Sequence, residues 1–353
     1  MTIGLRSFVA LTDVPVVGCY RHNDSFQILP PPPHASRPPA RLGHYPVIVE
    51  LAVPLVEQGQ QTELSHEISE DIVNVQIAQE RLKHLLLLLT GITHHRFFVP
   101  SSNQGWFISL GVFGSEVHSF VPQWGQEAYF LDEHEYKIDG FSPLPVEQIS
   151  QSDSSTYFNR YGRPPDQVLE FPDQISRLLN SADSLLPDAQ RALLSACSLL
   201  DQGLALWHAH PSLSFTSCVS ALEALIAFDH RGKATETCST CGQDRYRVMK
   251  KFQEFFARYG SPSPEFRKYA TKVYRYRSKI LHRGELFLCD VIQPKFGSFD
   301  GVDDRQLHRN LIRTVRICIV NWVALQQQAQ PSIPADLPRQ AGKVYIGTQR
   351  HIT

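Results

Sequence analysis

The second half of the chain carries apolar residues at helical spacing in five successive segments. In each segment they recur every three or four residues, which is the period of an α-helix with one buried face. Helix-start and helix-stop residues bound these segments, for example Pro264 in a first turn and Gly260 or Gly284 after a last one. The expected helices cover residues 187–210, 214–228, 246–259, 264–284 and 304–326, and a shorter one covers 173–184. Amphipathic helices in this order are expected to pack as an antiparallel bundle.

The first half of the chain is rich in expected strands. Apolar or aromatic runs bounded by turn residues predict strands at residues 6–11, 25–29, 47–53, 96–99, 106–113 and 129–136. One strong helical period interrupts them at residues 67–89 and is expected to stop at Gly91. The proline-rich residues 30–39 are expected to be a stiff connection between strands, with a docking motif as the alternative. The expected fold class is therefore α+β.

A change in composition separates the two halves. Residues 140–172 are dense in Gly, Pro and Ser, which is typical of a domain boundary. We therefore expect a mixed, strand-rich domain at residues 1–150, a linker at 151–172, a helical domain at 173–327 and a C-terminal tail at 328–353. The tail is polar and rich in proline, with one expected strand at residues 343–346.

Composition excludes several classes of protein. A chain of 353 residues with 42% hydrophobic residues can bury a sizeable core. It has no stretch of 18 uninterrupted apolar residues, and its N-terminus lacks the apolar run of a signal peptide, so we expect a cytoplasmic protein without a membrane span. The seven cysteines are few and scattered, which favours free thiols or one metal site over a disulfide framework.

Positive charge is concentrated in one segment. Residues 244–283 contain twelve basic and three acidic residues, a local net charge of +9, whereas the whole chain carries −1. A basic segment on an otherwise acidic protein is typical of a phosphate-binding groove, although a solvated helix face has the same composition. Tyrosine rings between the basic residues offer surfaces on which unpaired bases can stack. They belong to Tyr246, Tyr259, Tyr269, Tyr274 and Tyr276.

The same segment ends in an arginine and a histidine with complementary chemistry. Arg277 precedes His282 by five residues near the end of an expected helix. Arginine stays protonated and binds a phosphate through two parallel N–H groups, whereas histidine exchanges a proton near neutral pH. In a phosphodiester cleavage without metal, the imidazole takes the proton of a ribose 2′-hydroxyl and the guanidinium stabilises the charge that grows in the transition state. A pair at this spacing also arises by chance, or as a helix end whose cations favour the helix dipole, so the context has to decide.

An apolar helix lies about fifty residues upstream of this pair. It carries Ala-Leu-Glu-Ala-Leu-Ile at residues 221–226, and the basic helix carries Tyr-Arg-Tyr-Arg-Ser-Lys-Ile-Leu-His at residues 274–282. Together the two stretches resemble the HEPN superfamily, most closely its ApeA-like branch, over residues 173–327. Two positions depart from the usual pattern: Ser278 follows the arginine where Asn, Asp or His is frequent, and Arg283 separates the histidine from the next glycine.

The resemblance implies an endoribonuclease that needs no metal for catalysis. It makes Arg277 and His282 the catalytic pair and Glu223 an acidic helper, in an RNA-cleaving effector such as a toxin or an anti-phage component. RNA contacts are expected along the same helix, from Lys272, Tyr274, Arg275, Tyr276, Ser278, Lys279 and Arg283. The alternative is a non-catalytic HEPN-like domain that dimerises or binds nucleic acid. The position of the N-terminal domain before such an effector suggests that it senses a target or binds a protein trigger.

The five-residue offset also bears on assembly. At 100° per residue, Arg277 and His282 lie about 140° apart around a straight helix, so they do not both face one narrow groove of the same chain. The resemblance implies that such domains pair, and a two-fold pairing brings Arg277 of one protomer toward His282 of the other. We therefore expect a homodimer with a composite catalytic cleft.

The loop between the second and third expected helices carries Cys238-Ser-Thr-Cys241. Two cysteines at this spacing place two thiolates on one tetrahedral ion, and a structural zinc ion needs two further ligands. Candidates for those positions are Cys289, Cys218 and His230. Two free thiols on a loop are the alternative, and a redox pair is disfavoured because no strand precedes the motif. A zinc-supported structural adaptor is accordingly a third interpretation of the chain.

Overall fold

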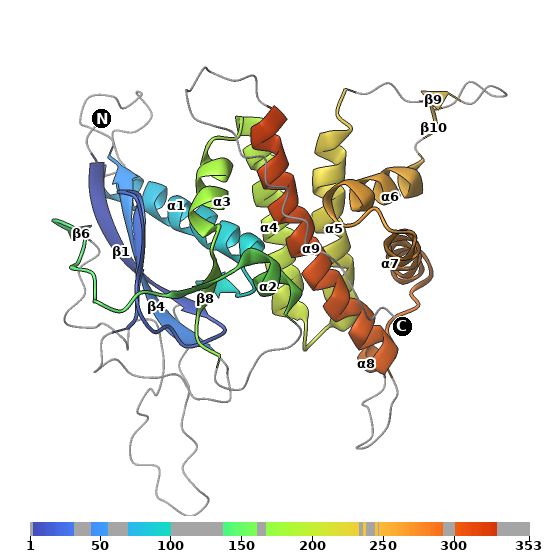
Figure 1. Ribbon diagram of the computed structural model, residues 1–353, viewed down its shortest axis with the longest axis horizontal. Helices are drawn as coiled ribbons and strands as arrows, with labels where there is room; N and C mark the ends of the chain where they lie inside the picture. The colour runs from blue at the N-terminus through green and yellow to red at the C-terminus, as the bar shows by residue number, and fades with distance from the viewer. Residues whose placement is uncertain are drawn as a thin grey trace, which may run out of the picture. The chain divides into compact units, whose positions relative to one another are not determined.

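The described part of the chain combines an antiparallel sheet with a helical region, which confirms the expected α+β class (Figure 1). The computed structural model describes residues 3–31, 44–55, 70–99, 137–160, 167–232, 236–237, 244–245, 247–291 and 301–329. These residues form two compact units. The first falls within Met1–Leu89, His95–Gln151 and Gly162–Phe171, and the second within Thr90–His94, Ser152–Tyr161 and Pro172–Thr353.

The first unit is built on a sheet with the strand order β2-β3-β4-β1-β5, in which β6 also pairs with β1. Its strands are β1 (Ile3–Thr12), β2 (Tyr20–His22), β3 (Phe26–Leu29), β4 (Tyr45–Pro54), β5 (Phe97–Phe98) and β6 (Lys137–Ile138). β1 and β4 pair along their whole length, from Ile3 opposite Pro54 to Thr12 opposite Tyr45. The last seven residues of β1 are all buried, and because neighbouring side chains point to opposite faces, both faces of the sheet are covered there.

A buried carboxylate attaches the segment after β6 to this sheet. Glu50 on β4 is 2% exposed. One of its oxygens accepts a hydrogen bond from Gln27 Nε2 at 2.7 Å and another from the Ser142 N–H at 2.8 Å. The Ser142 hydroxyl donates to the other oxygen. These bonds offset the cost of burying the carboxylate. The strands expected at residues 106–113 and 129–136 lie outside the described residues.

The segment expected to be a linker contains ordered elements instead. Within residues 151–172 the chain forms the end of β7 (Ser150–Ser152), the helix α2 (Ser154–Asn159) and β8 (Glu170–Pro172). Arg313 holds α2 in the second unit, since its Nε donates to the Phe158 carbonyl at 2.8 Å and its Nη2 donates to Asn159 Oδ1 at 2.6 Å. Composition predicted a loop here because contacts to a residue more than 150 positions away leave no local signal.

The second unit contains the expected helices. They are α3 (Ile175–Asp183), α4 (Pro187–Leu206), α5 (Pro211–Asp229), α6 (Val248–Tyr259), α7 (Pro264–Arg283), α8 (Leu288–Val291) and α9 (Val302–Ala329). α5 is the central helix and contacts α4, α6, α7, α8 and α9. Ten of its 19 residues are buried, so most sides of this helix are covered. The two motif helices of the sequence, α5 and α7, are therefore direct neighbours.

Gly91 lies in the last turn of its helix. The helix α1 (Glu70–Ile92) continues through this residue, and its end belongs to the second unit. A Cβ atom at Gly91 would lie 2.4 Å from Cys197 Sγ on α4. Glycine is therefore required by the close approach to Cys197, and the helix ends at Ile92, one residue beyond the expected stop.

A neutral histidine is buried in the helical core. His308 on α9 is 2% exposed. Its ring centroid lies 4.2 Å from that of Trp207 and 5.8 Å from that of Phe215. Ser214 Oγ donates to the Gly203 carbonyl at 2.5 Å, so it accepts from His308 Nε2 at 2.9 Å. Burial lowers the pKa of His308 from 6.5 to about 3.

Acid is expected to destabilise the protein through this residue. The folded-state pKa of His308 lies below the unfolded value of 6.5, so the unfolded chain binds the proton more readily. The contribution of neutral His308 to the free energy of unfolding is fully present above pH 6.5. It decreases as the pH falls toward 3, with a loss of about 2 kcal/mol at pH 5. Denaturant titrations at pH 7, 6 and 5 measure this loss, and His308→Gln, which keeps an N–H donor but does not titrate, should lack it. Equal pH dependence of the two proteins would contradict the assignment. If the variant does not fold, NMR titration of the wild-type His308 ring decides, because the ring should stay neutral down to pH 4.

Candidate functional site

The candidate site lies on α7, and local hydrogen bonds define both of its ends. Ser263 Oγ accepts from the Phe266 N–H at 3.1 Å. Pro264 occupies the first turn, where N–H groups have no acceptor within the helix, so the N–H that proline lacks costs no hydrogen bond. At the other end Gly284 adopts φ 66°, a left-handed conformation that glycine enters without a steric penalty. Its N–H donates to the Ile280 carbonyl at 3.2 Å. The helix therefore has a defined register and a defined exit.

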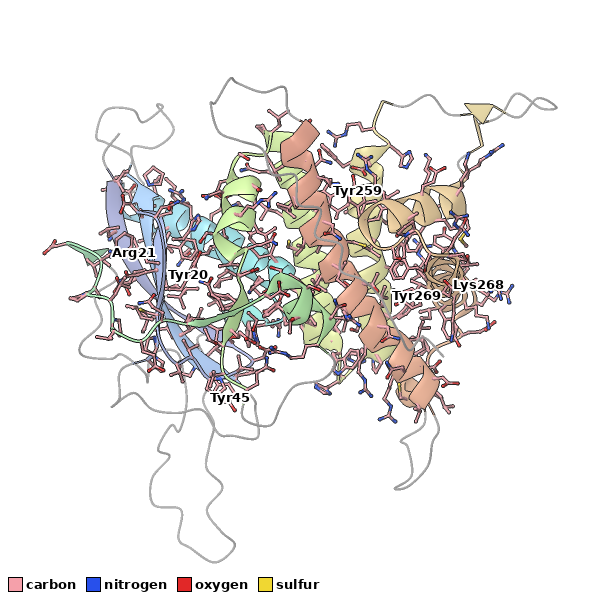
Figure 2. The ribbon with its side chains drawn as sticks, viewed as in Figure 1. Tyr20, Arg21, Tyr45, Tyr259, Lys268 and Tyr269 are labelled. Carbon is pink, nitrogen blue, oxygen red and sulfur yellow. The ribbon has the colours of Figure 1, made fainter. Side chains whose placement is uncertain are left out.

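Opposite faces of α7 have opposite character. The buried face consists of Phe266, Tyr269, Ala270, Val273 and Ile280. Cations at spacings of three or four residues form a stripe elsewhere on the helix: Lys268, Lys272, Arg275, Lys279 and Arg283. We call these five residues the cationic stripe. Figure 2 shows the contrast at neighbouring positions, with Lys268 pointing away from the bundle and Tyr269 pointing into it.

Like charges at this spacing repel one another within a helix. Four of the five stripe residues are exposed, and Lys279 is half-buried. Such a stripe lowers the stability of α7 and leaves positive charge on an exposed side of the helix. A row of cations along one helix is suited to a phosphate backbone.

Arg277 is the member of the expected catalytic pair that faces inward. Its Nη2 donates to Glu223 Oε2 on α5 at 3.2 Å, and the two side chains are 19% and 26% exposed. This partial burial makes the ion pair stronger than a fully exposed one. The Arg277 guanidinium carbon also lies 5.8 Å from the Tyr274 ring centroid. Two of the residues expected to act together, Glu223 and Arg277, are thus in direct contact.

Part of the Arg277 guanidinium has no protein partner. Its Nε is buried and makes no hydrogen bond within the described residues. A buried N–H donor without an acceptor is costly, and such atoms often mark the position of a bound group. The carboxylate of Glu223 therefore does not satisfy the whole Arg277 guanidinium.

His282 lies in the last turn of α7 and is exposed. A five-residue step turns it about 140° from Arg277 around the helix. Arg277 accordingly faces α5 while His282 faces solvent. The histidine is accessible to a substrate and to water, which a group that exchanges protons requires.

The other expected RNA contacts differ in their exposure. Lys272, Arg275 and Arg283 are exposed, whereas Tyr274, Tyr276, Ser278 and Lys279 are half-buried. The Tyr274 ring packs beside Phe252, with centroids 5.4 Å apart. The cations of this set are available to a ligand, but the aromatic rings are partly engaged in the protein.

Several tyrosines of the basic segment belong to the core rather than to a stacking surface. Tyr259 and Tyr269 are 0% and 6% exposed. The expectation that their rings stack on bases is wrong, because both residues fall on the apolar stripe of their helices. Tyr276 lies beside Phe215 and Phe287, with ring centroids 6.4 and 5.9 Å away. Burial of this ring raises the pKa of its hydroxyl. Tyr246 lies outside the described residues.

An acidic residue that sequence reasoning missed lies beside the cations at the end of α7. Glu285 Oε2 is 3.1 Å from Lys279 Nζ, and its Oε1 is 3.5 Å from Arg283 Nη1. The hydrogen bond from Lys279 lowers the pKa of Glu285. The left-handed Gly284 folds the chain back over the end of the helix and so brings Glu285 to these cations.

The expected zinc ligands do not converge in the described structure. Cys238 and Cys241 lie outside the described residues, between the paired strands β9 (Glu236–Thr237) and β10 (Asp244–Arg245). No group of three or more His, Cys, Asp or Glu suited to a metal ion occurs in the part of the chain that the structure describes. The further ligands of a zinc ion at this hairpin therefore do not form such a group among the described residues.

The three proposed additional ligands are also far apart. Cys289 on α8 lies near the start of α5, where Asp290 accepts from the Ser212 N–H at 2.9 Å. His230 follows the other end of α5, which is about 28 Å away. Cys218 is fully buried within α5, and burial raises the pKa of its thiol to about 12, which opposes the thiolate that zinc binds. Cys289 and His230 therefore do not both bind one zinc ion, and His230 is the candidate nearest to the hairpin in sequence.

One helix among the described residues is long and apolar enough to cross a bilayer. It is α5, with 19 residues, and 56% of its apolar stretch is buried inside the protein. Core helices of globular proteins pass the same test of length and composition, so this feature is weak support for a membrane span.

Comparison with known proteins adds no relative. No family model matches the chain, and no curated protein or solved structure matches it.

Proposed function

We propose that the protein is a metal-independent endoribonuclease of the HEPN type, with Arg277 and His282 as its catalytic residues. The contact between Glu223 and Arg277 carries this proposal. It joins the acidic residue of the Ala-Leu-Glu-Ala-Leu-Ile helix to the arginine of the basic helix, 54 positions away. If the spacing of Arg277 and His282 had arisen by chance at a helix end, this contact with Glu223 would not be expected.

In the proposed reaction each residue has a distinct role. His282 takes the proton from a ribose 2′-hydroxyl, whose oxygen attacks the adjacent phosphorus while the bond to the 5′-oxygen breaks. Protonated imidazole returns the proton to the leaving oxygen, and the products carry a 2′,3′-cyclic phosphate and a 5′-hydroxyl. Arg277 binds the phosphate oxygens and stabilises their growing charge. Glu223 is a positioning residue, because it holds the guanidinium and does not touch the reacting atoms.

We place the complete site between two protomers. Arg277 and His282 face different directions on one helix, and a two-fold pairing of α7 with its copy brings each arginine toward the histidine of the other chain. RNA is the proposed partner of the cationic stripe, and a toxin or anti-phage effector is the proposed role. The N-terminal unit is proposed to bind the target or protein trigger.

The second candidate is an RNA-binding protein that does not cleave. It is favoured by the ion pair itself, because Glu223 already neutralises part of the arginine charge and His282 lies on another side of the helix. The two candidates share the cationic stripe and differ only in chemistry.

Incubation with single-stranded RNA in EDTA separates the candidates. Cleavage that persists in the chelator and leaves cyclic phosphate ends supports the nuclease. Salt-sensitive binding without cleavage supports the second candidate, and the absence of both rules out each of them.

We also propose a structural zinc ion at the hairpin that joins β9 to β10, bound by Cys238 and Cys241. Elemental analysis of purified protein should then show about one zinc ion per chain, because bound metal contributes to folding. Cys241→Ser should release the ion and lower the melting temperature, whereas Cys289→Ser should retain the ion. If the purified protein contains no zinc and Cys241→Ser melts at the same temperature as the wild type, the zinc proposal is wrong and the two cysteines are free thiols. The nuclease proposal does not depend on this result.

A further inference from the structure

We infer that Lys279 and Arg283 form a phosphate subsite beside His282, and that the chain's own Glu285 carboxylate occupies this subsite when RNA is absent. This inference rests on the proposed function, since it assigns a regulatory role to a residue of that site. It concerns the end of the cationic stripe, where the proposed catalytic histidine lies.

Helix geometry places the three residues together. His282 is three positions and Arg283 four positions after Lys279, and side chains at these spacings are neighbours on a helix surface. A phosphate bound by Lys279 and Arg283 therefore lies next to the imidazole. The rest of the stripe continues from this point along α7, so a strand bound there leads its backbone to His282.

The backbone holds Glu285 over this point. The Gly284 N–H donates to the Ile280 carbonyl, and the Glu285 N–H donates to the Lys279 carbonyl at 3.3 Å. These two bonds close the end of α7 and set the backbone position from which the Glu285 side chain extends. Its two carboxylate oxygens then lie 3.1 Å from Lys279 Nζ and 3.5 Å from Arg283 Nη1. Like a phosphodiester group, a carboxylate bound by two cations carries one negative charge shared by two acceptor oxygens.

The contact is suited to exchange. The side chains of Lys279, Arg283 and Glu285 are 42%, 69% and 47% exposed, and ion pairs at such exposure are weak. A phosphate of a polyanion displaces the carboxylate readily, because its binding also releases counterions from the nucleic acid. Glu285 therefore lowers the affinity of the RNA-free site without blocking it.

The test measures binding to an RNA oligonucleotide that carries 2′-O-methyl groups and is not cleaved. Glu285→Gln keeps the shape of the side chain and removes its charge, and it should tighten binding about three- to tenfold at low salt. Glu265→Gln is the matched control, because Glu265 is an exposed acid in the first turn of the same helix and about 30 Å away. The control should change affinity by less than about twofold.

A second pair of variants tests the subsite itself. Adding Lys279→Gln or Arg283→Gln to Glu285→Gln should abolish the gain in affinity. If Glu285→Gln and Glu265→Gln change the affinity equally, the change reflects net charge alone and the inference is overturned. Weaker binding by Glu285→Gln would also overturn it. Cleavage of unmodified RNA is scored separately. If RNA is cleaved but Glu285→Gln does not change the affinity, only the subsite is ruled out. If Glu285→Gln binds more tightly but RNA is not cleaved, only the catalytic proposal is ruled out. If no variant binds RNA, both are ruled out.

Discussion

His282→Ala is expected to lower the rate of RNA cleavage by about 10²–10⁴-fold, the range that a positioned general acid or base contributes. Because His282 is exposed, the substitution removes no core contact and should leave the melting temperature nearly unchanged. Affinity for an uncleavable oligonucleotide should also change little, so the loss belongs to the chemical step. Rates measured on single-stranded RNA in EDTA, together with thermal melting, check all three expectations.

His208→Ala is the matched control for this variant. His208 is an exposed histidine of the same unit, just after α4, and its replacement should leave cleavage unchanged. Equal activity of wild type and His282→Ala would show that the imidazole does not take part in the reaction. Arg277→Lys extends the comparison, because it keeps the positive charge but loses the planar fork, and it should also lower the rate.

Mixing two inactive variants is expected to restore about a quarter of the wild-type activity. Arg277→Ala and His282→Ala each inactivate every site of their own homodimer. In a mixed dimer, the intact Arg277 and the intact His282 come from different chains and complete one of the two shared sites. Random exchange of equal amounts makes half of the dimers mixed, so about one site in four is intact. The gain over His282→Ala alone is then at least about 25-fold, given the loss of at least about 100-fold expected for that variant.

Subunit exchange has to be demonstrated in the same sample, for example with two affinity tags. Recovery of activity supports the composite site between protomers. No recovery despite exchange means that each chain needs its own Arg277 and His282, and a monomer by light scattering removes the model of a shared site. A mixture of Arg277→Ala with Arg277→Lys serves as the control, since none of its dimers contains an intact arginine.

Local periodicity predicted the elements of the fold well where neighbouring residues decide them. The expected helix at 264–284 corresponds to α7 at Pro264–Arg283, because Ser263, Pro264 and Gly284 define its ends within the sequence itself. The prediction failed where distant contacts decide. Gly91 marks the end of α1 to within one residue, but its close approach to Cys197 left no signal in the sequence. Residues 151–172 looked like a linker but include α2, which Arg313 holds.

The candidate site was predictable in part for the same reason. The residue types and their spacing on α7 place Lys279, His282 and Arg283 on one face without any knowledge of the other helices. Glu223 was expected to act with Arg277 only through the resemblance to a family, and their ion pair was not predicted, since the two residues are 54 positions apart. Glu285 was missed because an exposed acid after a glycine has no special pattern until the turn places it over the cations.

The sequence by itself determined the longer helices of the second unit, the strands β1, β3, β4 and β5, the concentration of positive charge and the order of chemical groups along α7. These features depend on residue type and on repeats of a few positions, so short stretches of the sequence are enough to predict them. Only the tertiary structure decided that Arg277 meets Glu223, that Tyr259 and Tyr269 are buried, and that His230 and Cys289 lie at opposite ends of α5. Those outcomes depend on how helices distant in sequence pack together, and packing is settled by the shapes of many side chains at once.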